Sequence, residues 1–182
     1  AGSALSIREP IDAVCPAFFQ EGRHRNELVW TEAMNIGELL SRDAVLADLK
    51  GKTKTDVLTG LVAPLLVLHP ELRSIDVVSV LNQREELGST AVGEGVAIPH
   101  GKVPGLSRLL LAVGRSSEDI DFNAPDGQPC RIFFLILVPE HGAGQHLRLL
   151  AQIARRAKDP VFRREVLLTE TADQLWQTLV AP

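Results

Sequence analysis

The stretch Arg131–Val138 constrains the fold of this chain most, because seven of its eight residues are apolar. A strand with one solvated face alternates apolar and polar residues, whereas an unbroken apolar run is typical of a strand covered on both faces. A second strand is predicted at Leu109–Val113, and Asn123–Gly127 between the two has the composition of a turn. We therefore predict an α/β layered domain, in which Arg131–Val138 is the central strand and helices lie on both sides of it.

Helical periodicity and capping signals predict the surrounding helices. One helix begins at the capping box that starts with Thr53, and another lies between Ser74, as its cap, and Gly88, as its end. A third follows Gly144, and two shorter helices close the chain, the last one starting at Thr171. The apolar stripes predict these buried positions: Val57, Leu58, Leu61, Val62, Leu65, Leu66, Val77, Val78, Leu81, Leu147, Leu150, Ala151, Ala154, Ala157, Phe162, Val166, Leu175 and Leu179.

Length and composition bound the domain organisation. With 182 residues and 45% apolar content, the chain is long enough for one domain with a sizeable core. The regular pattern begins at Met34, so we expect a single domain at residues 34–182 after an N-terminal arm or extension at residues 1–33. The net charge of -4 offers no electrostatic footprint for nucleic acid.

The cysteines and the apolar runs indicate a cellular location. Cys15 and Cys130 lie far apart, and neither belongs to a Cys-x-x-Cys pair. The longest strongly apolar run, Ile132–Val138, is far shorter than the roughly 20 residues that a helix needs to cross a bilayer. The N-terminus also lacks the basic and apolar regions of a signal peptide. We expect a cytoplasmic protein that is not inserted in a membrane.

The glycine-rich segment Gly88–Lys102 contains the first candidate for chemistry, His100. Three glycines lie between residues 88 and 95, and Pro99 fixes the backbone just before the histidine. The segment fails the P-loop pattern by one residue, and it has Ile98 where a dinucleotide fingerprint requires glycine. We therefore expect a loop that presents an imidazole of ordinary pKa, about 6.5, as a nucleophile. The alternative is a histidine that satisfies a loop hydrogen bond.

Other polar residues are candidates for an anion site around this imidazole. His146 falls at the start of a predicted helix, where free N–H groups favour an anion, and Arg84 ends the helix that leads into the glycine segment. Ser89 and Thr90 either donate hydroxyls to the same anion or form the turn. Each of these residues also has an ordinary structural explanation, as a helix-end or turn residue.

The remaining histidines carry little functional signal. A metal site formed by His100, His146 and His141 is an alternative, but these residues lack the spacing of a metal-binding helix face. His24 lies in the predicted arm, and His69 precedes a proline at a helix end. We expect no metal and no cofactor.

The segment Gly88–Lys102 resembles the active-site segment of the fructose/mannitol-type enzyme IIA proteins of the bacterial phosphotransferase system. The resemblance covers about residues 34–182. It extends to these further matches in order and spacing: Arg84-Glu85, Asp121-Phe122, Asp126-Gly127, Val138-Pro139 and His146-Leu147. It implies a mixed β-sheet between layers of helices, which agrees with the layered domain predicted above.

The resemblance also implies roles for the site residues. His100 corresponds to the histidine that accepts a phosphoryl group from a small histidine phosphocarrier protein. His146 corresponds to the second active-site histidine, and Arg84 to the arginine beside the phosphoryl group. Ser89, Thr90 and Gly101 are the expected phosphate-binding support.

Three roles remain open. We favour a nitrogen-related regulatory IIA, because the start at Met34 is similar to that branch and we expect no fused IIB or carrier segment. Such a protein would regulate other proteins, its partners, through its own phosphorylation state. The alternatives are a sugar-specific IIA that passes the phosphoryl group to a IIB transporter domain, and a binding module without catalytic function.

Overall fold

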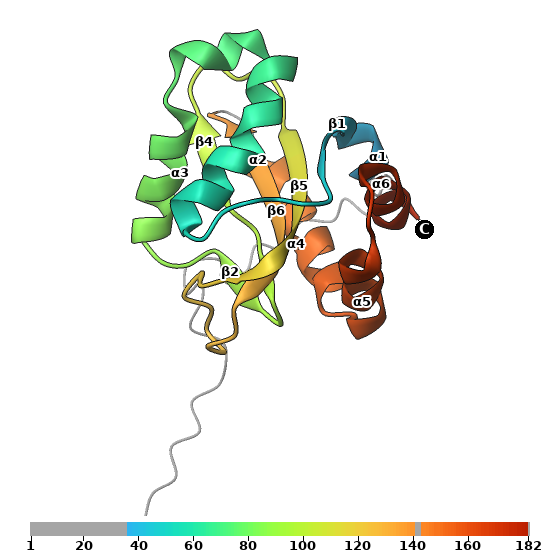
Figure 1. Cartoon of the computed structure of the whole chain (residues 1–182). Helices are drawn as coiled ribbons and strands as arrows, with labels where there is room; N and C mark the ends of the chain where they lie inside the picture. The colour runs from blue at the N-terminus through green and yellow to red at the C-terminus, as the bar shows by residue number, and fades with distance from the viewer. Residues whose placement is uncertain (1–35, 141–142, 182) are drawn as a thin grey trace, which may run out of the picture. The chain divides into compact units, whose positions relative to one another are not determined.

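The structure is a computed structural model that describes residues 36–140 and 143–181. The predicted arm at residues 1–33 lies outside the described residues. In the part of the chain that is described, a six-stranded mixed sheet lies between two groups of helices (Figure 1). The predicted α/β layered fold is therefore confirmed.

The sheet has the strand order β1-β5-β6-β3-β2, and β4 also pairs with β6. Antiparallel pairing joins β5 to β6 and β2 to β3, whereas β1–β5, β3–β6 and β4–β6 are parallel. The strands are β1 (Leu40–Leu46), β2 (Ala91–Gly93), β3 (Val96–Ala97), β4 (His100–Val103), β5 (Leu110–Ile120) and β6 (Cys130–Pro139). The central apolar run is β6, and every residue from Ile132 to Val138 is buried, as predicted.

The strand β5 is longer than the sequence indicated. The apolar pattern ends at Val113, yet the ladder with β6 continues through the pair of Arg115 and Ile132 to that of Ile120 and Cys130. Backbone pairing does not depend on apolar side chains, so a strand can continue where residues such as Ser117 are exposed.

Helices cover both faces of the sheet (Figure 1). They are α1 (Ile36–Leu39), α2 (Lys54–Leu68), the 3₁₀ helix η2 (Pro70–Ser74), α3 (Val77–Glu86), α4 (Ala143–Ala157), α5 (Pro160–Leu168) and α6 (Ala172–Val180). Helices α2 and α3 pack on β5 and β4, whereas α4 and α5 contact β6 and α6 contacts β1. The capping boxes predicted at Thr53 and Thr171 are both present.

Two details of the predicted helices are wrong. Asp76, not Ser74, caps α3, and its side chain accepts the Ser79 N–H at 3.0 Å. The serine instead ends the 3₁₀ turn that begins at Pro70, because proline suits the first position of a helical turn.

The buried face of α4 is also displaced from the predicted one. Leu149 and Ile153 are fully buried, whereas Leu147 is 55% exposed and Ala151 is exposed. Ala157 is buried as predicted, but Leu149 and Ile153 precede it at the same face, four residues apart, so periodicity alone could not choose between the two stripes. The contact with β6 decides which stripe is buried.

The segment expected to be a glycine loop contains three short strands instead. Strands β2 and β3 form a hairpin whose turn contains Gly93, Glu94 and Gly95, all at positive φ. Glycine favours such a turn because it has no Cβ to clash with the backbone. The chain then joins β6 again as β4, so His100 is the first residue of a strand and not a loop residue.

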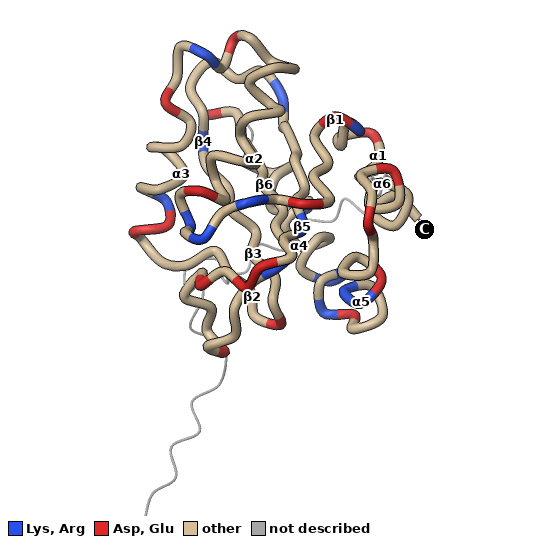
Figure 2. Tube along the Cα trace, in the orientation of Figure 1, with Lys and Arg blue, Asp and Glu red and all other residues tan. Residues whose placement is uncertain are grey.

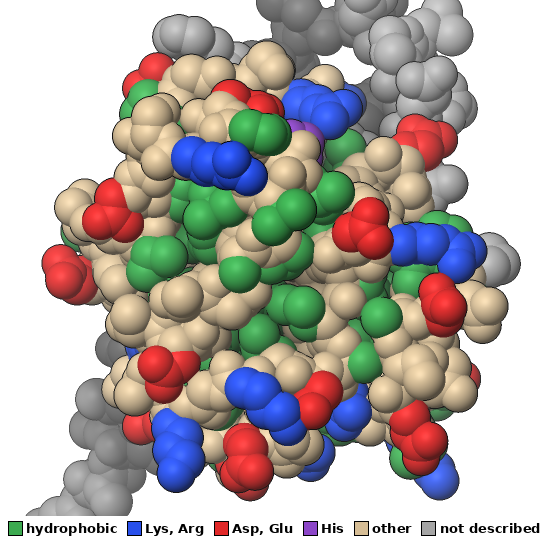
Figure 3. Space-filling view, turned by 45° about the horizontal axis from the view of Figure 1, so that its top comes forward, with side chains coloured by type: hydrophobic (Ala, Val, Ile, Leu, Met, Phe, Trp, Pro, Cys, Tyr) green, Lys and Arg blue, Asp and Glu red, His purple; other side chains and the backbone are tan. Residues whose placement is uncertain are grey.

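Charges of both signs lie along most elements (Figure 2). On the face shown in Figure 3, Lys and Arg side chains alternate with Asp and Glu around a centre that carries hydrophobic side chains. Among the described residues, no helix has the length and apolar character that a membrane span requires.

Candidate functional site

His100 is held by its own backbone neighbourhood. It opens β4 opposite Ile136 of β6, it is half-buried, and its ring Nδ1 lies 2.9 Å from the carbonyl oxygen of Ile98. A carbonyl oxygen only accepts, so Nδ1 carries the proton and donates it. In the neutral ring, the lone pair is therefore on Nε2. The sequence did not reveal this choice of nitrogen.

Burial is the main influence on the ionisation of His100. It lowers the pKa of the imidazole from the usual 6.5, since the charged form loses hydration. The positive charges of Arg84 and His146 lower this pKa further, whereas the hydrogen bond to Ile98 and the carboxylate of Glu85 raise it. The net shift is downward, so the expectation of an ordinary pKa is corrected. At neutral pH the ring is neutral and nucleophilic.

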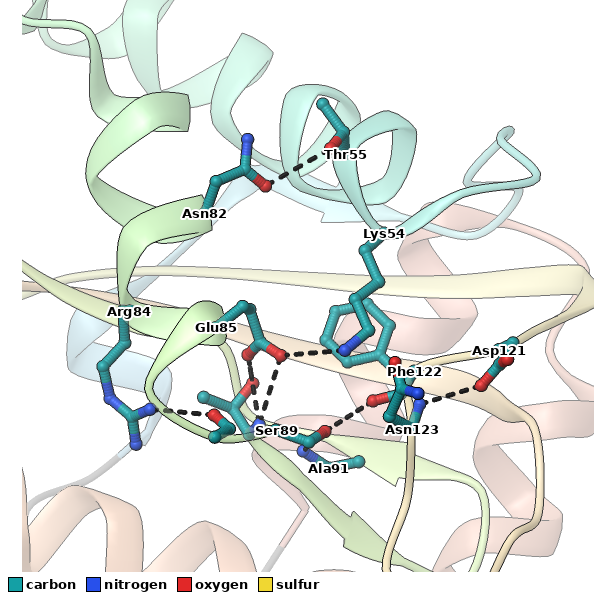
Figure 4. A network of polar contacts seen from close by, with 12 residues as sticks. Lys54, Thr55, Asn82, Arg84, Glu85, Ser89, Ala91, Asp121, Phe122 and Asn123 are labelled. Carbon is teal, nitrogen blue, oxygen red and sulfur yellow. Dashed lines mark hydrogen bonds and ion pairs between the residues drawn. The ribbon is translucent and has the colours of Figure 1, made fainter.

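Arg84 lies in the last turn of α3, beside the start of the glycine-rich segment. Its Nη1 donates to the carbonyl oxygen of Gly88 at 3.0 Å, as Figure 4 shows. A basic residue at this end of a helix also interacts favourably with the helix dipole. Arg84 as a whole residue is half-buried, and its charge lowers the pKa of the His100 ring.

His146 lies in the first turn of α4 and is half-buried. Its charge lowers the pKa of His100, as that of Arg84 does, and its place in one site with them stays a prediction. In the ranges that the structure describes, no group of three or more His, Cys, Asp or Glu residues could hold a metal ion. His141, the third ligand of the metal alternative, lies outside those ranges.

The hydroxyls of Ser89 and Thr90 have partners within the domain. The Ser89 hydroxyl donates to the carbonyl oxygen of Phe122, and the buried Thr90 hydroxyl donates to Glu85. These bonds fix the path of the chain from α3 into β2 (Figure 4). Both hydroxyls thus support the path of the chain, and their expected part in phosphate binding stays a prediction.

Gly101 is buried where α3 crosses β4. A Cβ atom at this position would lie 3.2 Å from side-chain carbons of Val80 and Leu81, so glycine allows the helix to approach the strand. Its expected part in phosphate binding stays a prediction.

The apolar residues of the glycine-rich segment and its flanking helices divide into buried and exposed ones. Val96, Ala97 and Ile98 belong to the core, with at most 3% of their surface exposed. The exposed apolar side chains in these segments are Val92 at 48%, Leu87 at 86% after α3, and Leu147 at 55% beside His146.

Sequence reasoning gave no role to Glu85, although it noted the residue beside Arg84. Its side chain is only 6% exposed, and Lys54 Nζ lies 3.4 Å from its Oε2. A carboxylate in the last turn of a helix faces the negative end of the helix dipole. That unfavourable position was the one available signal that Glu85 needs a partner.

Comparison with known proteins identifies the class as phosphoryl carriers of the phosphotransferase system. The family model described as phosphoenolpyruvate-dependent sugar phosphotransferase system, EIIA 2, matches residues 38–181. The chain belongs to this family.

Relatives of both functional branches are similar to this chain. A nitrogen regulatory protein of Bradyrhizobium diazoefficiens is 39% identical over 149 residues, which are 82% of this chain and 97% of that protein. The fructose-specific EIIABC component of Bacillus subtilis is 31% identical over 144 residues, which are 78% of this chain but 22% of that protein. The crystal structure of the nitrogen regulatory protein IIA-Ntr from Neisseria meningitidis has a TM-score of 0.72 at 33% identity, covering 79% of this chain and 98% of the other.

Proposed function

We propose that His100 accepts a phosphoryl group on Nε2 from a histidine phosphocarrier protein, and that the cytoplasmic phosphoprotein acts as a nitrogen-related regulatory switch. The observation that supports the acceptor atom is the hydrogen bond from Nδ1 to the Ile98 carbonyl oxygen. It leaves the lone pair of the neutral ring on Nε2.

The phosphoryl transfer needs no cofactor, because one N–P bond forms as another breaks. The Nε2 lone pair attacks the phosphorus atom of the donor phosphohistidine, and the donor N–P bond breaks with its electron pair returning to the donor imidazole. The lowered pKa of His100 favours this step, because a protonated ring has no lone pair to offer. Arg84 and His146 would stabilise the charge on the transferring oxygens, which is the main task of a site for phosphoryl transfer.

The regulatory role is supported by sequence identity. The nitrogen regulatory protein of Bradyrhizobium diazoefficiens is 39% identical to this chain, whereas the fructose-specific component of Bacillus subtilis is 31% identical. Phosphorylation would add a charge of about -1.5 to -2 at His100, in a domain whose exposed apolar side chains include Leu87 after α3, Val92 in β2 and Leu147 beside His146. A partner that covers His100 would have to bury the new charge or dissociate, and burying an unpaired charge costs several kcal/mol.

Reconstitution with purified proteins tests both parts of the proposal. Labelled phosphate should pass from a phosphorylated histidine phosphocarrier to this protein and map to His100. The product should be acid-labile and base-stable, as a phosphoimidazole is. Failure of the intact protein to accept phosphate would support the binding-module alternative.

A second arm of the same experiment separates the two carrier roles. The phosphorylated protein is mixed with a sugar-specific IIB domain, and candidate regulated proteins are tested for binding to either form. Fast transfer to IIB without any phosphorylation-dependent binding would replace the regulatory role with the sugar-transport role.

A further inference from the structure

A buried carboxylate lies one residue after Arg84, at the end of α3. The Glu85 side chain is 6% exposed, whereas its neighbour Glu86 is exposed. A buried charge is costly to the fold unless partners compensate it, and the helix dipole is unfavourable to an anion at this end. The carboxylate must therefore be held by specific contacts.

Those contacts join three segments of the domain. Lys54 from the start of α2 places its Nζ 3.4 Å from Glu85 Oε2, and the same ammonium lies 5.1 Å from the centre of the Phe122 ring. On the other side, the Thr90 N–H donates to Glu85 Oε1 at 3.1 Å, and the Thr90 hydroxyl donates to the same oxygen. Figure 4 shows the carboxylate between Lys54 and the chain that enters β2.

The contacts continue from Thr90 to the phosphoacceptor. The carbonyl oxygen of Thr90 accepts the N–H of Ile98 at 3.0 Å. The carbonyl oxygen of Ile98 in turn accepts the proton of His100 Nδ1 at 2.9 Å. A continuous line of polar contacts thus runs from Lys54 through Glu85, Thr90 and Ile98 to the imidazole.

We propose that Glu85 is a positioning residue for phosphoryl transfer: it anchors Thr90, and through Ile98 it holds the His100 ring with Nδ1 as donor and Nε2 as acceptor. This proposal rests on the proposed function. Because the contacts of Glu85 lie on Thr90 and Lys54, it acts through other residues and not on the phosphoryl group.

The charge of Glu85 has a second effect on the same ring. Its carboxylate raises the pKa of His100, which opposes the lowering by burial, Arg84 and His146. It would also repel a phosphoryl dianion on the ring, which limits how tightly the group is held. A carrier must release its group, so moderate repulsion suits the function better than strong stabilisation.

The test uses Glu85→Gln, which keeps the shape of the side chain. If the glutamine oxygen takes the place of Oε1 and accepts from Thr90, the amide N–H₂ group takes the place of Oε2 and faces the Lys54 ammonium. The first readout is the tautomer of the His100 ring from ¹⁵N chemical shifts in the unphosphorylated protein. The second is the single-turnover rate of phosphoacceptance at equal folded protein. We expect a mixture of Nδ1–H and Nε2–H tautomers and a rate lower by about tenfold to hundredfold, the effect of losing one hydrogen bond to a charged group.

Two further variants separate positioning from general loss of structure. Glu86→Gln changes the exposed neighbour and should leave both readouts unchanged. Lys54→Met with Glu85→Gln removes the ammonium that the new amide would face, so it should recover the Nδ1–H tautomer and most of the rate. If Glu85 served stability alone, the His100 ring of the folded protein would stay in the Nδ1–H form in both variants, and only the folded fraction would change.

The outcomes are distinct. A wild-type tautomer and rate in Glu85→Gln would overturn the proposal, and so would a rate that falls only in proportion to the folded fraction. If the unchanged protein accepts no phosphate, the proposed function fails, while the ¹⁵N comparison still tests whether Glu85 holds the ring.

Discussion

The two histidines of the site are supported in different ways. His100 opens a strand, pairs with central β6 and donates from Nδ1 to the backbone. His146 lies in the first turn of α4, whose buried face is formed by Leu149 and Ile153. The next residue, Leu147, is 55% exposed. One histidine is thus held by the backbone of a strand, and the other lies at the start of a helix, three residues before the buried Leu149.

This difference fits the two roles proposed for the histidines, acceptor of the phosphoryl group for His100 and donor to its oxygens for His146. A group that is attacked and released repeatedly needs one ring nitrogen directed outward, and a strand with a backbone acceptor fixes that direction. A residue that would only donate to the transferring oxygens does not need a fixed tautomer, because a neutral imidazole has one N–H in either form. We therefore expect substitutions in the β4 region to abolish transfer and those at the start of α4 to slow it.

The largest effect is expected for the strand histidine. His100→Ala should abolish phosphoacceptance, because it removes the imidazole whose Nδ1 donates to Ile98 and whose Nε2 would accept the phosphoryl group. The measurement is acid-labile label after incubation with a phosphorylated phosphocarrier. Label that maps to Ser89, Thr90 or His146 in the unchanged protein would contradict the assignment.

The next prediction concerns the two leucines of α4. Leu149 is fully buried, so Leu149→Ala should lower the free energy of unfolding by about 2 to 5 kcal/mol. Leu147→Ala should change it by less than about 0.5 kcal/mol, as is usual for exposed positions. Denaturant unfolding of both variants provides the comparison. Equal destabilisation would show that α4 buries the stripe that the sequence suggested.

The comparison of these leucines also shows where the sequence was informative. The unbroken run at Arg131–Val138 predicted the central strand, and Thr53 predicted the start of α2, because both signals are local. Periodicity could not select the buried stripe of α4, since two stripes have the same spacing and only the contact with β6 distinguishes them.

The same limit applies to the site. The family pattern predicted one site for His100, Arg84 and His146, and the charges of the latter two lower the pKa of His100. It could not reveal the contact of Lys54 with Glu85, which joins residues 31 positions apart. It also could not show that Val96, Ala97 and Ile98 are core residues, because short strands and glycine loops have similar compositions.

Smaller effects are expected for the two residues that would contact the phosphoryl oxygens. Arg84→Ala and His146→Ala should fold and still accept phosphate, but about tenfold to hundredfold more slowly, since each removes a charged hydrogen bond of about 1.5 to 3 kcal/mol. The single-turnover rate of transfer measures this loss of rate, once the melting temperatures show that the variants are as stable as the unchanged protein. Arg84→Lys is the control that retains the charge without the planar guanidinium. A wild-type rate in either alanine variant would exclude that residue from the site.

The smallest effect is a displaced pH profile. Burial lowers the pKa of His100, so the acid limb of phosphoacceptance should have its midpoint below the 6.5 of an ordinary histidine. Between 6.5 and the folded-state pKa, the unfolded chain binds more protons than the folded one, so this group also lowers stability as the pH falls.

Arg84→Ala removes a charge that lowers the pKa of His100, and the midpoint of this variant should therefore move up toward 6.5. An NMR titration of the His100 ring, with His100→Gln to assign the resonances, measures both midpoints. A midpoint at or above 6.5 in the unchanged protein would mean that the acceptor is hydrated like a surface histidine, and the contrast between the two histidines would be lost.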